Sequence, residues 1–369
     1  MSAMELLRIL VGVVVLIVVV LVNTIVVMWC ERKWMGHMMS RMGPMRTGWH
    51  GVLQPFADAL KMLGKEDLMP SGADKLLFMI APMLAFAPSL VMYAATPWVA
   101  EFAGMSFDSG IFMVFAAAAL FPIGVLLAGW ASHNKYSMMG GFRAAAQQIS
   151  YEIPIILSAM GVVMLAGSMK LQTIVDSQSL VWNVVTQSFA FIIFFICVFA
   201  ELNRTPFDLP EGESELVGGY NTEYSSMRFA LFFVAEYANM FTWSLLTALL
   251  YFGGWGGPLL PGWIWLFLKT YLIVFVIIWV RATMPRVRVD QLMAFGWKVL
   301  LPAGLINVLI TATGAITSMW LLVAMEFVAA VAFVWFIGRL GARAGDKERA
   351  AAVAAAAGAA GRPKPGAES

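Results

Sequence analysis

LLRILVGVVVLIVVVLVNTIVVMW, residues 6–29, is an almost unbroken apolar run, and it decides the fold class. A helix needs about 20 apolar residues to cross the roughly 30 Å hydrocarbon layer of a membrane. The run shows no alternation of polar and apolar residues, which favours a helix over a barrel strand. It is too long for the apolar part of a signal peptide and has no small-residue cleavage site, so we expect it to be retained as a membrane helix.

The whole chain shares this apolar character. Its 369 residues are 61% hydrophobic and 12% charged, with a mean hydropathy of +0.80, well outside the range of soluble domains. We therefore predict an all-α, polytopic transmembrane helical bundle of about nine spans, forming a single transmembrane domain over residues 1–340. The candidate spans are 6–29, 76–99, 111–130, 150–169, 182–202, 229–252, 262–280, 299–315 and 318–338.

Basic residues gather in the connections on one side of this predicted bundle. The connections after the first, third, fifth and seventh spans are rich in Lys and Arg, whereas the opposite side carries only Arg8 and Lys170. The positive-inside rule then places the N-terminus outside and the C-terminus in the cytoplasm. The Ala-rich, low-complexity segment 341–369 is predicted to be a disordered cytoplasmic tail.

The stretch AELNRTPFDLPEGESELVGGYNTEYS, residues 200–225, is unusually acidic for so apolar a chain. The simplest interpretation is a solvated loop that joins two membrane helices. Its prolines and glycines exclude a continuous helix, so the chain there is turn-like or extended. Glu211, Glu213 and Glu215 alternate and would point the same way in an extended segment. Such crowding would keep at least one of them protonated and would create a store of protons.

Three carboxylates lie within reach of the bilayer: Glu152, Glu201 and Glu236. Acidic side chains inside a span cost at least about 2.5 kcal/mol on insertion scales and by default mark proton or substrate pathways. Each could instead be neutralised by a neighbour, as Arg204 could neutralise Glu201. Because all three lie toward the same side as the acidic stretch, the set favours proton handling.

The first inner connection contains an amphipathic segment. Leu53, Phe56, Leu60 and Leu63 recur at helical spacing, opposite a polar row that includes Gln54 and Asp58. This pattern predicts an interfacial helix that serves either as a membrane anchor or as one wall of a cavity. Cys30 and Cys197 are far apart and have no companion ligands, so we predict no metal site on this chain.

Long blocks of the sequence resemble the quinone-site membrane subunit of respiratory complex I, NADH:quinone oxidoreductase, which is numbered 1 in mitochondria and lettered H in bacteria. The likeness runs from the first span through residue 302. Besides the acidic stretch, it is carried by ERKWMGHMMSRMGPMRTG at 31–48, GGFRAAAQQISYEIP at 140–154, FALFFVAEYANM at 229–240 and WVRATMPRVRVDQLMAFGWKVLLP at 279–302.

The resemblance implies a subunit that catalyses no step alone. In that family it forms the membrane side of a quinone tunnel, against hydrophilic subunits with the quinone headgroup site and the terminal iron–sulfur cluster. NADH, FMN and the iron–sulfur clusters would lie on partner subunits, and quinone would be the substrate. Small membrane subunits, antiporter-like proton-pumping subunits and lipid would be further partners, with no nucleic acid. The ninth span and the Ala-rich tail suggest a bacterial chain, in the plasma (inner) membrane.

The resemblance also assigns roles residue by residue. The regions 30–75 and 203–228 would form the quinone and partner interface. The quinone tunnel residues would be Glu31, Arg32, Arg41, Asp58, Phe229, Phe233, Arg281 and Arg286. The proton-coupling residues would be Glu152, Glu201, Asp208, Glu211, Glu213, Glu215, Glu223 and Glu236, with Lys33, Arg143 and Arg204 as supporting charges.

Two other functions are compatible with the sequence. One is the homologous subunit of a membrane-bound hydrogenase, or of an oxidoreductase with another electron donor. The other is an independent proton-coupled transporter, although the inverted repeats and broken helices usual for that class are not visible. The sequence does not distinguish ubiquinone from menaquinone.

Overall fold

The computed structural model describes residues 3–98, 107–210 and 216–360. Within these ranges the chain forms helices and their connections, without a β-strand, so the predicted all-α bundle is confirmed. The principal helices are α1 Ala3–Met38, α2 Gln54–Gly64, α3 Lys75–Ala95, α4 Gly110–Ala118, α5 Phe121–Ala131, α6 Lys135–Ala166, α7 Leu171–Ser177, α8 Asn183–Thr186, α9 Ser188–Glu201, α11 Ser226–Tyr251, α12 Gly262–Thr283, α13 Val289–Phe295, α14 Leu301–Ile316 and α15 Met319–Ala360. Single turns η1 Trp49–Gly51 and η2 Gly219–Asn221 and the π-helical η3 Gly296–Leu300 complete the described elements.

Eight helices in the described ranges are long and apolar enough to cross a membrane, and they coincide with eight of the nine predicted spans. The remaining predicted span, 182–202, is shorter than expected. Gln187 (φ −132°, ψ 50°) interrupts the helix, leaving the single turn α8 and the 14-residue α9. At 1.5 Å per residue α9 is about 21 Å long, less than the roughly 30 Å hydrocarbon layer. Its irregular ends are acceptable because they are buried among other helices rather than exposed to lipid.

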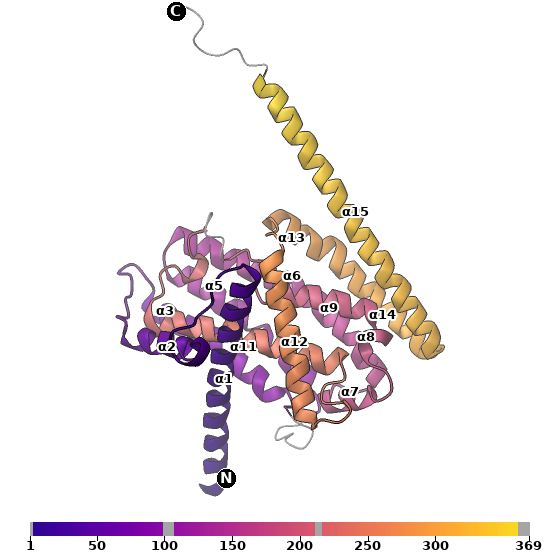
Figure 1. Ribbon diagram of the computed structural model, residues 1–369, viewed down its shortest axis with the longest axis horizontal. Coiled ribbons are helices and arrows are strands. Elements are labelled where there is room, and N and C mark those ends of the chain that lie inside the picture. Colours follow the sequence, from indigo (N-terminus) through magenta and orange to yellow (C-terminus); the bar gives the residue numbers. More distant parts are fainter. Residues whose placement is uncertain (1–2, 99–106, 211–215, 361–369) are drawn as a thin grey trace, which may run out of the picture.

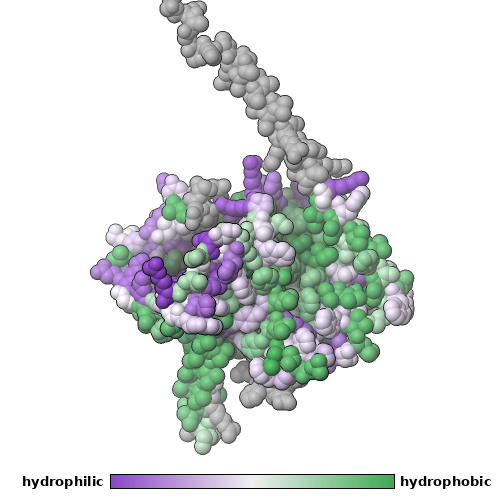
Figure 2. Space-filling model, in the orientation of Figure 1, coloured by the Kyte–Doolittle hydropathy of each residue, from purple (hydrophilic) through white to green (hydrophobic). Residues whose placement is uncertain are grey.

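The centre of the bundle is α11, which packs against α1, α3 and α12. It lies across the picture in Figure 1, whereas α1 and α12 run along its vertical direction. From Ala235 to Tyr251 every residue of α11 is buried, including the large side chains of Trp243 and Tyr251. The outer half of α1 is the opposite case: Figure 2 shows it as an apolar rod that projects from the body. Its side chains have the exposure expected of a surface that meets lipid or another membrane subunit.

The peripheral helices α2 and α15 differ in how well they agree with the prediction from the sequence. The predicted amphipathic helix is α2, and its apolar residues Phe56, Leu60 and Leu63 are each at least 50% exposed while its polar row faces α1. The last helix, α15, continues to Ala360 and thus passes residue 340, where the predicted tail begins. Residues 361–369 of that tail lie outside the described ranges.

Candidate functional site

The connection between α1 and α2 folds back over the C-terminal end of α1. The Lys33 ammonium donates hydrogen bonds to the carbonyl oxygens of Pro44 (3.3 Å) and His50 (3.5 Å), and the Trp29 indole donates to His50 (3.4 Å). Gly51 makes this fold possible: its φ is +77°, and a Cβ there would lie 2.3 Å from the Pro44 carbonyl oxygen. The loop 39–51 therefore covers the end of α1, and we call it the roof.

Beneath this roof lies an open cavity of about 410 Å³. Four of the predicted tunnel residues line it together, although they come from α1, the roof and α12. The lining residues are Glu31, Arg32, Met35, Arg41, Met42, Gly43, Pro44, Tyr237 and Arg281. Its wall thus combines charged groups with thioether and aromatic surfaces, as ligand pockets commonly do.

Glu31 is the buried charge at this cavity. Only 3% of the residue is exposed, and its Oε1 accepts hydrogen bonds from Arg281 and, at 3.4 Å, from Arg204. Its Oε2 is buried and has no hydrogen-bond partner among the described residues. The two arginines balance the charge of the carboxylate through one oxygen, and its other oxygen keeps its capacity to accept a hydrogen bond.

A chain of ionisable side chains leads from Glu31 into the bundle. Arg204 lies over the Tyr237 ring, 5.0 Å from the ring centre, and its Nη2 is 4.0 Å from Glu236 Oε2. The Tyr220 hydroxyl donates a 2.7 Å hydrogen bond to Glu236 Oε1. Asp208 is near enough to act electrostatically on Glu236. Members of both predicted sets, Glu31 and Arg281 from the tunnel and Glu236 and Asp208 from the coupling residues, are therefore linked through Arg204.

Glu201 and Glu152 form a second pair of neighbouring acids, on α9 and α6. Glu201 is 7% exposed, its Oε2 has no hydrogen-bond partner in the described part of the chain, and it interacts electrostatically with Glu152. Two glutamines of α6 fix the chain around Glu201. Gln147 donates to the carbonyl oxygens of Ala200 (2.7 Å) and Phe207 (2.8 Å), and Gln148 donates to that of Glu201 (3.2 Å).

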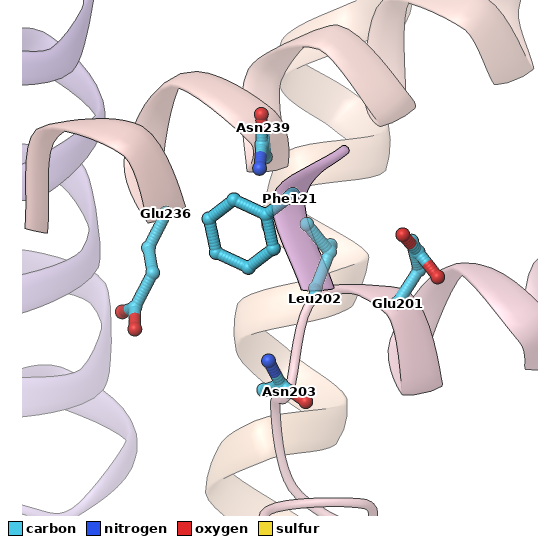
Figure 3. A pocket seen from close by; sticks show the side chains of 6 residues that line it. All are labelled: Phe121, Glu201, Leu202, Asn203, Glu236 and Asn239. Atoms are coloured by element: carbon cyan, nitrogen blue, oxygen red, sulfur yellow. The ribbon is translucent and has the colours of Figure 1, made fainter. Parts of the chain in front are cut away.

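An apolar contact separates Glu236 from the pair Glu201 and Glu152. Figure 3 shows the Phe121 ring and the Leu202 side chain between the side chains of Glu236 and Glu201, with Asn239 and Asn203 on either side. The space among these residues is too small for a water molecule. No direct hydrogen bond between the Glu236 and Glu201 side chains is found among the described residues, so this apolar contact separates the two acids.

The outer wall of the cavity is tied to α2 by an ion pair. Asp58 of α2 accepts hydrogen bonds from Arg32 and, at 3.1 Å, from Gln54. Partial burial raises the pKa of Asp58, but the hydrogen bonds from Arg32 and Gln54 and the positive charge of Arg32 outweigh it and leave the pKa below its ordinary value. Asp58 thus positions the arginine and does not itself line the cavity.

The other predicted residues lie apart from the cavity wall. Phe229 and Phe233 of α11 pack on one another, with ring centres 4.6 Å apart, and neither lines the cavity. Arg286 donates to the Leu209 carbonyl oxygen (3.3 Å), which ties the segment before α13 to the acidic stretch. Arg143 is half-buried on α6. Glu223 lies in a different open cavity of about 380 Å³, where it accepts a 2.6 Å hydrogen bond from Asn134.

The predicted alternating acids Glu211, Glu213 and Glu215 lie outside the described residues. Conversely, the structure draws attention to three groups that the sequence prediction did not select. Tyr220 binds Glu236, Lys269 of α12 donates to the Phe252, Gly254 and Gly256 carbonyl oxygens near the end of α11, and Glu326 is fully buried in α15. Lys269 and Glu326 are charged residues within apolar runs of the sequence. That pattern alone could have marked them as candidate functional residues.

Comparison with known proteins agrees with this architecture. A sequence profile described as NADH dehydrogenase matches residues 11–312. The chain belongs to the NADH dehydrogenase family. That match contains all the predicted site residues, from Glu31 to Arg286, and ends before α15.

Curated relatives of this NADH dehydrogenase family member include bacterial H subunits of NADH-quinone oxidoreductase. The chain is 48% identical over 321 residues to one such protein, numbered 1, of Geobacter sulfurreducens, covering 81% of this chain and 92% of that protein. It is 50% identical over 304 residues to the H subunit of Brevibacillus brevis, covering 81% and 90%. It is 52% identical over 287 residues to the H subunit of Geobacillus thermodenitrificans, covering 76% and 86%.

Proposed function

We propose that this protein is the H subunit of a proton-pumping NADH:quinone oxidoreductase, in which it forms the membrane side of the quinone chamber and the first part of the proton path. The observation that carries this proposal is the position of Glu31. It is a buried carboxylate, bound by arginines from two separate segments, at the wall of a cavity of about 410 Å³. The names of the relatives supply the reaction class.

Quinone reduction consumes two electrons and two protons, so a quinone chamber needs groups that hold, orient and exchange protons. The apolar wall at Met35, Met42 and Tyr237 suits the ring and isoprenoid tail of a quinone, while the charged wall suits its oxygens. The free oxygen of Glu31 suits this role as an acceptor for a reduced headgroup. Electrons would come from partner subunits, because quinone reduction requires an external donor.

The electrostatic coupling would run from Glu31 through Arg204 to Glu236, and protons would be carried by the acids Glu236, Glu201 and Glu152. Arginine does not release its proton, so it transmits charge by electrostatics rather than by transfer. A change of charge at the cavity would alter how strongly Arg204 is attracted to Glu31 and to Glu236. Opening of the contact between Phe121 and Leu202 would then admit water and connect the two acidic groups. Glu211, Glu213 and Glu215 remain predicted contributors.

The proposal also sets the surroundings of the chain. The positive-inside rule orients the N-terminus outward and the roof over Glu31 toward the cytoplasm of a bacterium, in the plasma membrane. The roof 39–51 and the segment 203–228 would meet the hydrophilic quinone-site and iron–sulfur subunits, which hold the clusters and pass on electrons from NADH and FMN. The exposed apolar half of α1 would meet lipid or small membrane subunits.

The test is labelling of the assembled complex with a photoreactive quinone analogue. We expect labelled peptides from residues 31–45 or from α12 next to Arg281, competed by excess quinone, and reduced at least tenfold in Glu31→Gln. Glu66→Gln, which alters an exposed acid between α2 and α3, is the matched control and should label like the wild type. Labelling confined to other parts of this chain would contradict the chamber, and purification with a hydrogenase in place of an NADH-oxidising module would contradict the reaction.

A further inference from the structure

A buried carboxylate lies far from the cavity, in the last helix. Glu326 of α15 is 0% exposed and falls inside the apolar span Met319–Leu340. Its Oε2 accepts a 3.2 Å hydrogen bond from the backbone N–H of Phe189, in the first turn of α9, and its Oε1 lies 3.5 Å from the Thr311 hydroxyl of α14. In Figure 1, α8, α14 and this part of α15 lie on the opposite side of the body from α2 and α3.

Glu326 has no basic partner among the residues that the structure describes, since none of their ion pairs includes it. The helices packed against this part of α15 are α8, α9 and α14; α8 and α14 carry no ionisable side chain, and α9 carries only Cys197 and Glu201. The phenol of Tyr251 on α11 is a further ionisable group that interacts with it electrostatically. A carboxylate without a counter-ion inside a membrane protein needs a bound proton or cation to balance it.

A cluster of uncharged polar side chains extends from Thr311, beside this carboxylate. Gln187 and Thr311 are both 0% exposed, and the Gln187 amide donates a 2.9 Å hydrogen bond to the Thr311 hydroxyl. They meet Asn307, also 0% exposed, over the bare backbone of Gly161 on α6. A Cβ at Gly161 would lie 2.4 Å from Gln187 Oε1, 3.0 Å from Asn307 Nδ2 and 3.2 Å from Thr311 Oγ1. The absence of a side chain at Gly161 therefore gives these polar groups their space.

Several polar atoms of this cluster have no hydrogen-bond partner among the described residues, which marks a place for a ligand. They are Gln187 Oε1, Ser188 Oγ, Asn307 Oδ1 and Asn307 Nδ2. The set contains acceptors and also a donor. A metal cation would satisfy only the acceptors and would repel the amide N–H, whereas water satisfies both kinds of group. The chemistry thus favours water molecules and the proton that they carry.

We propose that Glu326, with Gln187, Asn307 and Thr311, forms a second proton-binding site at the N-terminal end of α9. The carboxylate takes up one proton from water and becomes a carboxylic acid, and no electron moves. Thr311 and the N–H of Phe189 hold the carboxylate oxygens, while Gln187 and Asn307 hold the water that delivers the proton. Glu201 ends the same helix, so α9 has a protonatable acid at each end.

This inference goes beyond the proposed function and does not depend on it. Glu326 itself lies outside residues 11–312, which the family profile matches, and the site involves none of the residues assigned to quinone. Its ligand is a proton, and its test measures protonation rather than quinone reduction. It would stand even if the Glu31 cavity bound no quinone.

The experiment is infrared difference spectroscopy of the complete purified complex during a pH titration, in H₂O and in D₂O. A buried carboxylic acid has a carbonyl stretching band of its own, which shifts on deuteration. We expect one such band to be lost in Glu326→Gln and to be shifted in frequency and in its titration midpoint in Thr311→Val. Glu66→Gln, which alters an exposed acid, should leave that band in place.

The variants also keep the proposal falsifiable if one fails to assemble. If Glu326→Gln yields no complex, Thr311→Val and Asn307→Leu remain, and both should shift the band because they alter the groups around the carboxylate. Unchanged bands in all variants that assemble would overturn the proposal. A band that responds to Na⁺ at constant pH would overturn it as well, because the ligand would then be a cation.

Discussion

Glu31 and Glu326 are both fully or almost fully buried carboxylates, yet their surroundings differ in kind. Glu31 is bound by Arg204 and Arg281, which carry full positive charge. Glu326 contacts a backbone N–H group and the Thr311 hydroxyl, which in turn accepts a hydrogen bond from the Gln187 amide. The first environment balances a fixed negative charge, whereas the second suits a group that gains and loses a proton. The comparison separates a carboxylate that organises charge from one that stores a proton.

The largest effect is expected for Glu31→Gln, which tests whether Glu31 holds the two arginines in place. The substitution leaves Arg204 and Arg281 without the carboxylate, and removing one partner of a buried ion pair costs about 3–5 kcal/mol. We expect reduced assembly, a lower temperature of unfolding, and at least a tenfold loss of NADH-driven quinone reduction with reduction of artificial acceptors retained. Normal stability together with normal quinone reduction would show that Glu31 does not organise the arginines.

The next largest effect is expected for Phe121→Ala, which tests the apolar contact between the two acidic groups. Truncation of this buried ring should cost about 3 kcal/mol and leave space between Glu236 and Glu201. If the contact controls proton movement, the variant will reduce quinone but pump fewer protons per electron pair in proteoliposomes. Phe121→Leu, which keeps an apolar side chain in place, should retain more of the pumping. Full pumping in Phe121→Ala would exclude a barrier at this position.

Glu326→Gln should have a much smaller effect on stability than Glu31→Gln. The amide replaces a carboxylic acid of nearly equal shape and strands no buried positive charge, so we expect a change of about 1 kcal/mol or less in the free energy of unfolding. Thermal unfolding of the purified complex measures this difference. A loss as large as that of Glu31→Gln would mean that Glu326 is held as a permanent anion.

The smallest effect belongs to Asp58, whose carboxyl group is partly exposed. Its pKa is lower in the folded protein, so its contribution to stability is fully present above the unfolded value of about 3.9 and is lost as the pH falls through the lower folded value. Asp58→Asn should cost less than about 1 kcal/mol at pH 7, and salt should reduce this cost. A cost that does not depend on salt would point to packing rather than charge.

The sequence predicted the membrane bundle well because long apolar runs state the positions of helices directly. It also selected Glu31 and Arg281 together for the quinone tunnel, although they are 250 positions apart, with Glu236 assigned to proton coupling and Arg204 to the supporting charges. Resemblance supplied that grouping, and the spacing of the residues could not have done so. The partners Tyr220 and Gln147 were missed because their role depends on how the segment after α9 turns back.

The differences between prediction and structure have physical causes. The span 182–202 looked continuous because its composition is apolar throughout, and the break at Gln187 becomes understandable only when Gln187 is seen bound to Thr311 of α14. Glu326 stands alone in an apolar run, so no neighbour in the sequence indicates its polar cluster. Phe229 and Phe233 pack against each other on α11, and the residue of α11 that lines the cavity beside Glu31 is Tyr237, one turn after Phe233.

The roof over the cavity is fastened differently from its floor. Lys33 donates hydrogen bonds to the carbonyl oxygens of Pro44 and His50, which do not titrate. The opposite wall of the cavity contains ionisable groups such as Glu31, which is bound by Arg204. A change in the charge of these acids and arginines therefore leaves the hydrogen bonds that hold the roof intact. The cavity can thus change its charge while the hydrogen bonds that hold the loop above it stay in place.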